Sequence, residues 1–283
     1  MTKKEIESIA QKNSVSNATI DKDWVLGHLL NAFYTNDDNK NIFIFKGGTC
    51  LKKCYFEDYR FSEDLDFTLL DKSFKIDSNF INKITKSITE YTNIRFYLNG
   101  IKTQIHNDVE QGYEIKIKFW GADHKPNLPV PPTKRWQTYI KIDISFSEMV
   151  FDKPNMRKII HPYSDSHFLS KTIPVYSMLE IISEKLRALI QRNRPRDIYD
   201  IWYIMNSKIG LNKLDIKNLL IQKANSKGIE ISGVEQFVND EKLRKNKRAW
   251  KSSLGHHLPI AKLPDFDFVY NDLTKVVAEI IQS

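Results

Sequence analysis

Cysteine is scarce in this chain, which has only Cys50 and Cys54 among 283 residues. Their spacing on an expected helix provides neither a zinc quartet nor a disulfide framework, which favours a reducing compartment. Long hydrophobic runs are also missing, because stretches such as 42–45 and 175–182 fall far short of the roughly 20 residues of a membrane span. No apolar segment follows the first basic residues, so we expect no signal peptide and no membrane association. A cytoplasmic protein is the expectation.

Several catalytic signatures are absent as well. The sequence contains no His-Glu-x-x-His, no Gly-x-Ser-x-Gly, no Gly-x-Gly-x-x-Gly and no Gly-x-x-x-x-Gly-Lys-Ser/Thr. These absences disfavour a zinc protease, an α/β-hydrolase, a Rossmann dehydrogenase and a P-loop ATPase.

What the chain does contain is a basic surplus and enough apolar residues for a core. Lys and Arg number 43 against 35 Asp and Glu, a net charge of +8, and hydrophobic residues make up 41%. One basic cluster lies between Lys185 and Arg196. A second has no acidic residue; it consists of Lys242, Arg244, Lys245, Lys247, Arg248 and Lys251. Such clusters are usually solvated helix faces, and the alternative is a nucleic-acid backbone as partner.

The first half of the chain alternates helices and strands. Apolar spacing predicts a helix over 20–33, with Asn17 or Thr19 as N-cap, and further helices over 49–56 and 74–91. The residues at 36–39 are typical of a turn. Segment 113–120 alternates apolar and polar residues, which indicates a strand with one wet face. With the other apolar segments it predicts a mixed sheet, with strands at 42–45, 65–70, 94–98, 113–120 and 138–146.

The second half reads differently. Residues 121–135 carry prolines at 126, 129, 131 and 132, which indicate a long connection. After Glu148 we expect no further strand. We place a domain boundary near residue 170, in a connection with two prolines, Pro154 and Pro162. The expected fold is α+β, with a mixed-sheet domain over 1–170 and a helical domain over 171–283. Its helices are expected at 176–191, 196–206, 214–224, 234–251 and 266–281.

Three aspartates on expected strands draw attention. Asp64 and Asp66 are two residues apart on one strand, so their carboxylates project to the same side. Like charges held together need neutralising, and a divalent cation with oxygen ligands can do so. Asp143 lies among aliphatic residues, where a charge needs a role or a partner. A third carboxylate joins the pair if its strand lies beside theirs.

A glycine turn precedes these carboxylates. Lys46-Gly47-Gly48-Thr49 ends one strand and opens a helix, where backbone N–H groups can bind phosphate, although a plain turn is the ordinary interpretation. The order of glycine turn, Asp-x-Asp strand and later lone aspartate matches the needs of nucleotidyl transfer.

These segments resemble a known family. FKGGTCL at residues 45–51 and RFSEDLDF at residues 60–67 resemble the first two motifs of the AbiEii/AbiGii-type toxins, in the DNA polymerase β-like nucleotidyltransferase superfamily. SEKLRA at 183–188 and RDIYDI at 196–201 are similar to the third and fourth motifs, and DKDWVL at 21–26 to the family's first helix. The resemblance covers roughly residues 18–205.

The resemblance implies roles for individual residues. Asp64, Asp66 and Asp143 would hold two Mg²⁺ ions, and Lys185 would contact phosphate. Asp200 would be the acidic residue of the fourth motif, supported by Asp197. The remaining alternatives are a surface salt-bridge network for Lys185 and Arg196 and, for Asp197, an early-turn carboxylate that the helix dipole favours. The implied nucleotide-binding residues are Lys46, Gly47, Gly48, Thr49, Ser62, Lys185 and Arg196.

The implied function is that of a magnesium-dependent toxin from a toxin–antitoxin or abortive-infection pair, with a cognate antitoxin as possible partner. It would transfer a nucleoside monophosphate from a nucleoside triphosphate to an RNA acceptor, in particular the 3′ end of tRNA. Two alternatives remain open: nucleotidylation of a protein Ser, Thr or Tyr hydroxyl, and a non-catalytic nucleotide-dependent binding module. Trp136 and Trp250 are either core residues or platforms for exposed bases.

Overall fold

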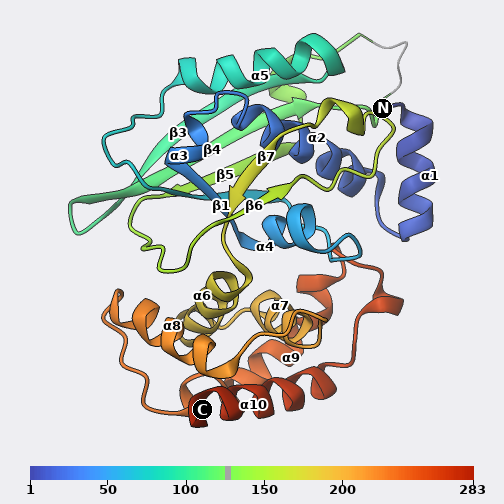
Figure 1. Cartoon of the computed structure of the whole chain (residues 1–283). Helices are drawn as coiled ribbons and strands as arrows, with labels where there is room; N and C mark the ends of the chain where they lie inside the picture. Colours follow the sequence, from blue (N-terminus) through green and yellow to red (C-terminus); the bar gives the residue numbers. More distant parts are fainter. Residues whose placement is uncertain (125–128) are drawn as a thin grey trace. The chain divides into compact units, whose positions relative to one another are not determined.

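The chain folds into two compact units. The computed structural model describes residues 1–124 and 129–283. Part of the long connection expected over 121–135, with the proline at 126, therefore lies outside the described residues. Unit 1 comprises Met1–Glu148 and Pro154–Val175, and unit 2 comprises Met149–Lys153 and Tyr176–Ser283 (Figure 1). The predicted α+β fold is confirmed, with a mixed sheet in unit 1 and helices in unit 2.

A seven-stranded sheet forms the centre of unit 1, in the order β3-β4-β5-β2-β1-β7-β6. The pairs β2–β5 and β1–β7 are parallel and the other neighbours are antiparallel. The expectation of no strand after Glu148 is wrong, because two strands of four residues follow it. Segments so short offer too few positions for a period-2 pattern. The strands are β1 (Phe43–Lys46), β2 (Asp64–Leu69), β3 (Arg95–His106), β4 (Val109–Trp120), β5 (Tyr139–Ser145), β6 (Asn155–Lys158) and β7 (Thr172–Val175).

Helices pack on the sheet within unit 1. Helix α2 is buried along most of its length, and α5 packs on α2 and β3 (Figure 1). The N-cap of α2 is Ser16, whose hydroxyl accepts from the N–H of Thr19, and not Asn17 or Thr19. Helix α1 has no counterpart among the predictions. The helices are α1 (Lys3–Asn13), α2 (Asn17–Phe33), α3 (Asn39–Ile42), α4 (Gly47–Cys50), a π-helix η1 (Leu51–Tyr55), α5 (Ser78–Thr92), η2 (Thr133–Arg135) and η3 (Ser166–Phe168).

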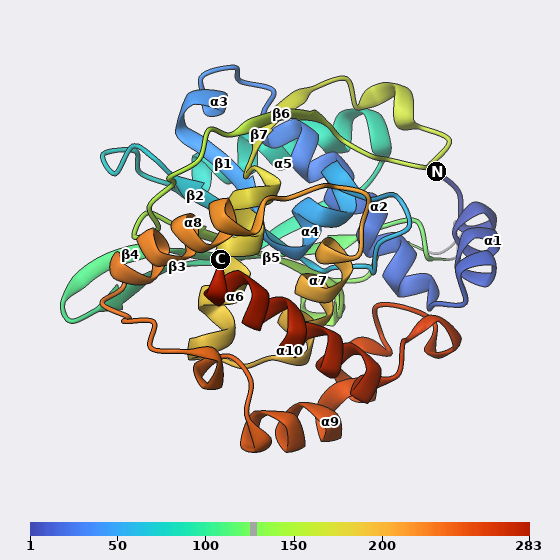
Figure 2. The same ribbon diagram turned by 60° about the horizontal axis from the view of Figure 1, so that its bottom comes forward.

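Unit 2 is helical. Helix α7 packs against α6, α9 and α10, and its first residue is Pro195, whose fixed φ suits a helix start (Figure 2). The helix predicted over 234–251 is in fact interrupted, because the side chain of Asn239 caps a new helix at the N–H of Lys242. The helices are α6 (Met178–Gln191), α7 (Pro195–Met205), α8 (Lys213–Asn225), η4 (Val234–Gln236), α9 (Asp240–Leu254), η5 (Ile260–Lys262) and α10 (Phe266–Gln282).

Two tryptophans considered as base platforms belong to the core. The side chains of Trp136 and Trp250 are 4% and 3% exposed. Their indole N–H groups donate to the carbonyls of Pro131 and Pro264. The stacking interpretation is therefore wrong for both. Among the described residues, no helix combines the length and hydropathy needed to cross a membrane.

Candidate active site

The pairing of β2 with β5 brings two of the three predicted aspartates together. These strands are parallel, and their register sets Asp66 opposite Asp143 and Asp64 opposite Lys141. Neighbouring strands lie about 4.8 Å apart, so Asp66 and Asp143 are direct neighbours. Lys46 of β1 stands opposite Asp66 on its other side.

Charged and polar groups surround the Asp143 and Asp64 carboxylates. The Asp143 carboxylate accepts from the Lys141 ammonium at 2.7 Å and from the Gln104 amide at 3.4 Å. Burial raises the pKa of Asp64, Lys141 lowers it, and Asp143 raises it further. The Asp143 charge therefore makes ionisation of Asp64 harder, and a bound cation would relieve this repulsion.

The three carboxylates are near one another but not converged. Within the described residues, the groups whose ligand atoms all lie within 4.8 Å of one another do not include Asp64, Asp66 and Asp143 together. The donor set itself, three carboxylates on one partly exposed sheet face, suits the oxygen-preferring Mg²⁺.

The glycine turn lies directly against Asp66. Gly47 has φ +81°, and a Cβ added there would stand 2.1 Å from the Asp66 Oδ2. A Cβ on Gly48 would approach the guanidinium of Arg60 at 2.9 Å and the hydroxyl of Ser62 at 3.1 Å. At position 47, only glycine tolerates both the positive φ and the close approach of the Asp66 carboxylate.

The residues flanking the turn are also accounted for. The Thr49 hydroxyl donates to the carbonyl oxygen of Asp64, which ties the turn to β2. Lys46 and Thr49 are buried, and Ser62 is half-buried. Unit 1 thus gathers the first two motifs, Lys46 to Thr49 and Ser62 to Asp66, around the Asp66–Asp143 pair.

The third and fourth motifs form an ion cluster in unit 2. The Lys185 ammonium lies 2.6 Å from an Asp200 carboxylate oxygen and 3.6 Å from one of Asp197. Two guanidinium nitrogens of Arg192 donate to the Asp197 carboxylate at 2.9 and 2.8 Å. Lys185, Asp197 and Asp200 are buried, so this is no network of solvated surface charges. Arg196, in the first turn of α7, is half-buried.

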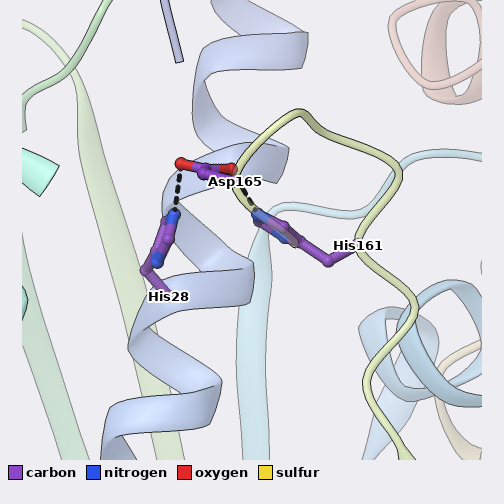
Figure 3. Close-up of side chains that lie close together, drawn as sticks. All are labelled: His28, His161 and Asp165. Carbon is purple, nitrogen blue, oxygen red and sulfur yellow. Dashed lines mark hydrogen bonds and ion pairs between the residues drawn. The ribbon is translucent and has the colours of Figure 1, made fainter. Parts of the chain in front are cut away.

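The structure also contains a cluster that sequence reasoning missed. His28 of α2, His161 and Asp165 lie together, and within the described residues this is the group of three that could hold a metal ion (Figure 3). The Nε2 atoms of the two histidines lie 3.1 and 3.2 Å from the two oxygens of Asp165. The Trp24 indole N–H donates to the same carboxylate at 2.8 Å.

Hydrogen bonding explains this cluster without an ion. Asp165 is the acceptor that joins α2 to the loop between β6 and β7, and these bonds outweigh its desolvation and hold its pKa below the usual range. Burial lowers the pKa of His161 to about 4, so the ring is neutral at pH 7. Trp24 with His28, and His161 with Asp165, each show an i, i+4 spacing. Nothing in the sequence links the two pairs.

The basic cluster of unit 2 divides in the structure. The Lys242 ammonium donates to the carbonyls of Leu189, Ile190 and Gln236, so it caps the end of α6. Lys247 pairs with Asp267 at 2.5 Å. Four further members lie on the solvent side of α9; they are Arg244, Lys245, Arg248 and Lys251.

Comparisons with known proteins bear on this geometry. The sequence profile described as the nucleotidyl transferase AbiEii toxin of type IV toxin–antitoxin systems matches residues 28–272. No curated protein matches the chain in sequence. The solved structure of the nucleotidyltransferase toxin MenT4 from Mycobacterium tuberculosis is similar to it with a TM-score of 0.66 and 16% identity, over 100% of this chain and 90% of that one. JHP933 from Helicobacter pylori is similar with a TM-score of 0.58 and 17% identity, over 95% and 94%.

Proposed function

Since this chain belongs to the AbiEii family of nucleotidyltransferase toxins from type IV toxin–antitoxin systems, we propose that it transfers a nucleoside monophosphate to the 3′-terminal hydroxyl of an RNA, with tRNA as the favoured acceptor. The donor is a nucleoside triphosphate. The acceptor oxygen forms a bond to the α-phosphorus while the bond to pyrophosphate breaks, and pyrophosphate leaves. The toxin acts in the cytoplasm and is neutralised by a cognate antitoxin.

One observation carries the proposal: Asp66 lies beside Asp143 on an open sheet face with the Gly47 turn against it. Asp64, Asp66 and Asp143 are the residues that would hold Mg²⁺, which supplies charge neutralisation for the triphosphate and the leaving group. In this assignment Gly47, Gly48 and Thr49 form the turn that binds the triphosphate, and the buried Thr49 ties that turn to Asp64 through its hydroxyl.

The remaining motif residues complete the proposed assignment. Lys46 and Ser62 flank the turn and support triphosphate binding. In unit 2, Lys185 and Arg196 supply cationic groups for phosphate, and Asp200 holds Lys185 in place through their 2.6 Å ion pair. A point charge on a lysine held by carboxylates suits phosphate without demanding one fixed geometry.

RNA is favoured as the acceptor by charge. Besides Lys247, which pairs with Asp267, the exposed side of α9 carries four cations, Arg244, Lys245, Arg248 and Lys251. Within that helix the acidic residues are confined to its first turn. A nucleic-acid backbone is the partner that such a row of charges attracts. A non-catalytic descendant would have no need to keep three mutually repelling carboxylates, which argues against the binding-module alternative.

The experiment is a labelling reaction with the purified chain. Each α-labelled nucleoside triphosphate is incubated with Mg²⁺ and either total RNA or protein from a lysate. We expect label in RNA, lost in Asp66→Ala and retained in Asp71→Ala, which removes an exposed carboxylate just beyond the end of β2. Label in protein alone would instead establish protein nucleotidylation, and equal transfer by Asp66→Ala would eliminate the proposed mechanism.

A further inference from the structure

The face of the sheet that carries the aspartates continues across β4 and β3. The register of β3, β4 and β5 places Tyr97 opposite Lys118, and Lys118 opposite Tyr139. All three side chains point to the same face, because residues opposite each other in a sheet share a side. Two tyrosines therefore flank a lysine in a single row across three strands.

A second row lies between the tyrosines and the Asp66–Asp143 pair. It runs from Lys116 of β4 to Lys141 of β5 and then to Asp64 of β2. Lys141 is engaged by Asp143 at 2.7 Å and by Glu114 at 3.4 Å. Moving along the strands, the face thus changes from aromatic and cationic to anionic.

Exposure and contacts show what this surface offers. The Tyr97 and Tyr139 side chains are 45% and 40% exposed. The Lys116 ammonium lies 4.3 Å from the centroid of the Tyr139 ring, and that of Lys22 lies 5.4 Å from it. Cations at the ring hold it in place and leave part of its surface to solvent.

The exposed rings contribute less to folding than buried rings would. Lys116 and Lys141 stand directly opposite each other, and the Asp143 and Glu114 carboxylates offset the charge of Lys141. Exposed aromatic rings interspersed with ammonium groups are what an unpaired nucleic-acid strand binds, with bases on the rings and phosphates on the cations.

We propose that Tyr97, Lys116, Lys118 and Tyr139, here named the β-face platform, bind the single-stranded end of the RNA acceptor. The inference rests on the proposed function and assigns its acceptor site. Tyr139 precedes Asp143 by four residues on β5, about 13 Å along the strand. That distance corresponds to about four stacked nucleotides at ~3.4 Å each. A terminal hydroxyl at the aspartates thus leaves the preceding bases over the tyrosines.

The geometry favours an unpaired end over a duplex. Stacking on a ring requires a base whose face is free, and paired bases within a helix have none. The test therefore uses two RNA probes with the same terminal sequence, one with an unpaired 3′ tail and one with a blunt end. Both are labelled for fluorescence anisotropy.

The first variants address the rings. Tyr139→Ala should weaken binding of the tailed probe about 5- to 150-fold, because one base–aromatic stack contributes roughly 1–3 kcal/mol. Tyr139→Phe should bind nearly as the wild type does, since the ring remains. Binding of the blunt probe should change little in either variant. Equal affinity of Tyr139→Ala and wild type for the tailed probe would overturn the platform.

The second variants address the charges. Lys116→Gln with Lys118→Gln should reduce the slope of log affinity against log salt by about 1.4, at roughly 0.7 per phosphate contact on a single strand. The matched control is Lys83→Gln with Lys86→Gln, two exposed lysines on α5. Its slope should remain that of the wild type. An equal reduction in both doubles would show a diffuse effect of net charge and overturn the site.

A triphosphate-binding and transfer assay separates this inference from the proposed function. Platform variants should bind nucleoside triphosphate as the wild type does and should lose RNA transfer through a raised KM for RNA. RNA labelling that depends on Asp66 but is indifferent to every platform variant would leave the proposed function standing and refute the platform. Label found only on protein would refute both.

Discussion

Gly47→Ala is the substitution whose effect follows most directly from the geometry of the turn at Gly47. The new methyl group would stand 2.1 Å from the Asp66 Oδ2, whereas ordinary contacts begin at 3.4 Å. The Asp66 carboxylate, the more mobile partner, must move by about 1 Å or more, and a displacement of that size at a reacting site costs on the order of 100-fold in rate.

The same substitution has a modest effect on stability. At φ +81° a residue with a Cβ costs about 1–2 kcal/mol relative to glycine. For a unit of this size, that corresponds to a fall in Tm of about 2–8 °C. We therefore expect a folded protein with nucleotidyl transfer reduced on the order of 100-fold.

Gly228→Ala is the matched control. Its φ is also positive, at +65°, but a Cβ there meets no atom within 4 Å. Transfer is measured with α-labelled triphosphate, and Tm by circular dichroism. The control should lose stability and keep activity. Wild-type transfer by Gly47→Ala would refute the placement of Asp66 at the reacting centre. An equal loss of transfer activity in Gly47→Ala and Gly228→Ala would show that backbone strain, and not displacement of the carboxylate, lowers the rate.

Three further outcomes are expected. Burial lowers the pKa of His161 to about 4, so between pH 4 and the unfolded pKa of about 6.5 the unfolded chain binds one proton more than the folded chain. The free energy of unfolding should therefore fall by up to about 3 kcal/mol as the pH is lowered through this range. Urea unfolding between pH 7 and 4.5 should show a smaller pH dependence in His161→Gln and the wild-type dependence in His167→Gln, which changes an exposed histidine. Lys185→Ala should lower the free energy of unfolding by about 3–5 kcal/mol, because the buried Asp200 carboxylate loses the ammonium 2.6 Å away; unchanged nucleotide affinity in calorimetry would restrict Lys185 to that structural role. Replacing Lys245 and Arg248 by Gln should reduce the salt slope of RNA binding by about 1.4–1.8, and an unchanged slope would leave α9 as a solvated face.

Local patterns in the sequence were sufficient to predict the local geometry of two segments of the candidate site. The common side of Asp64 and Asp66 follows from strand alternation, and the turn at Gly47 follows from two adjacent glycines between a strand and a helix. Both depend on residues only a few positions apart, whose geometry the backbone itself restricts. The motif resemblance extended this to the family, which the profile match confirms.

Short elements and caps were harder to predict for a related reason. Strands β6 and β7 have four residues each, and β7 contains a proline, so neither carries a readable period. Ser16 could not be chosen over Asn17 or Thr19 as the N-cap because all three side chains can accept a backbone N–H. Backbone conformation at the boundary decides among them.

Pairings between distant residues came only from the folded chain. The parallel register of β2 and β5 sets Asp143 beside Asp66, whereas a shift of two residues would have set Lys141 there instead. Asp165 meets Trp24 and His28 across more than 130 positions of sequence, and Lys242 caps carbonyls of a different helix. Such contacts depend on how whole helices and strands pack, and the local sequence pattern of each element is compatible with many ways of packing them. The sequence was therefore sufficient to predict the candidate residues of the site, and the tertiary structure decided which residues lie beside them.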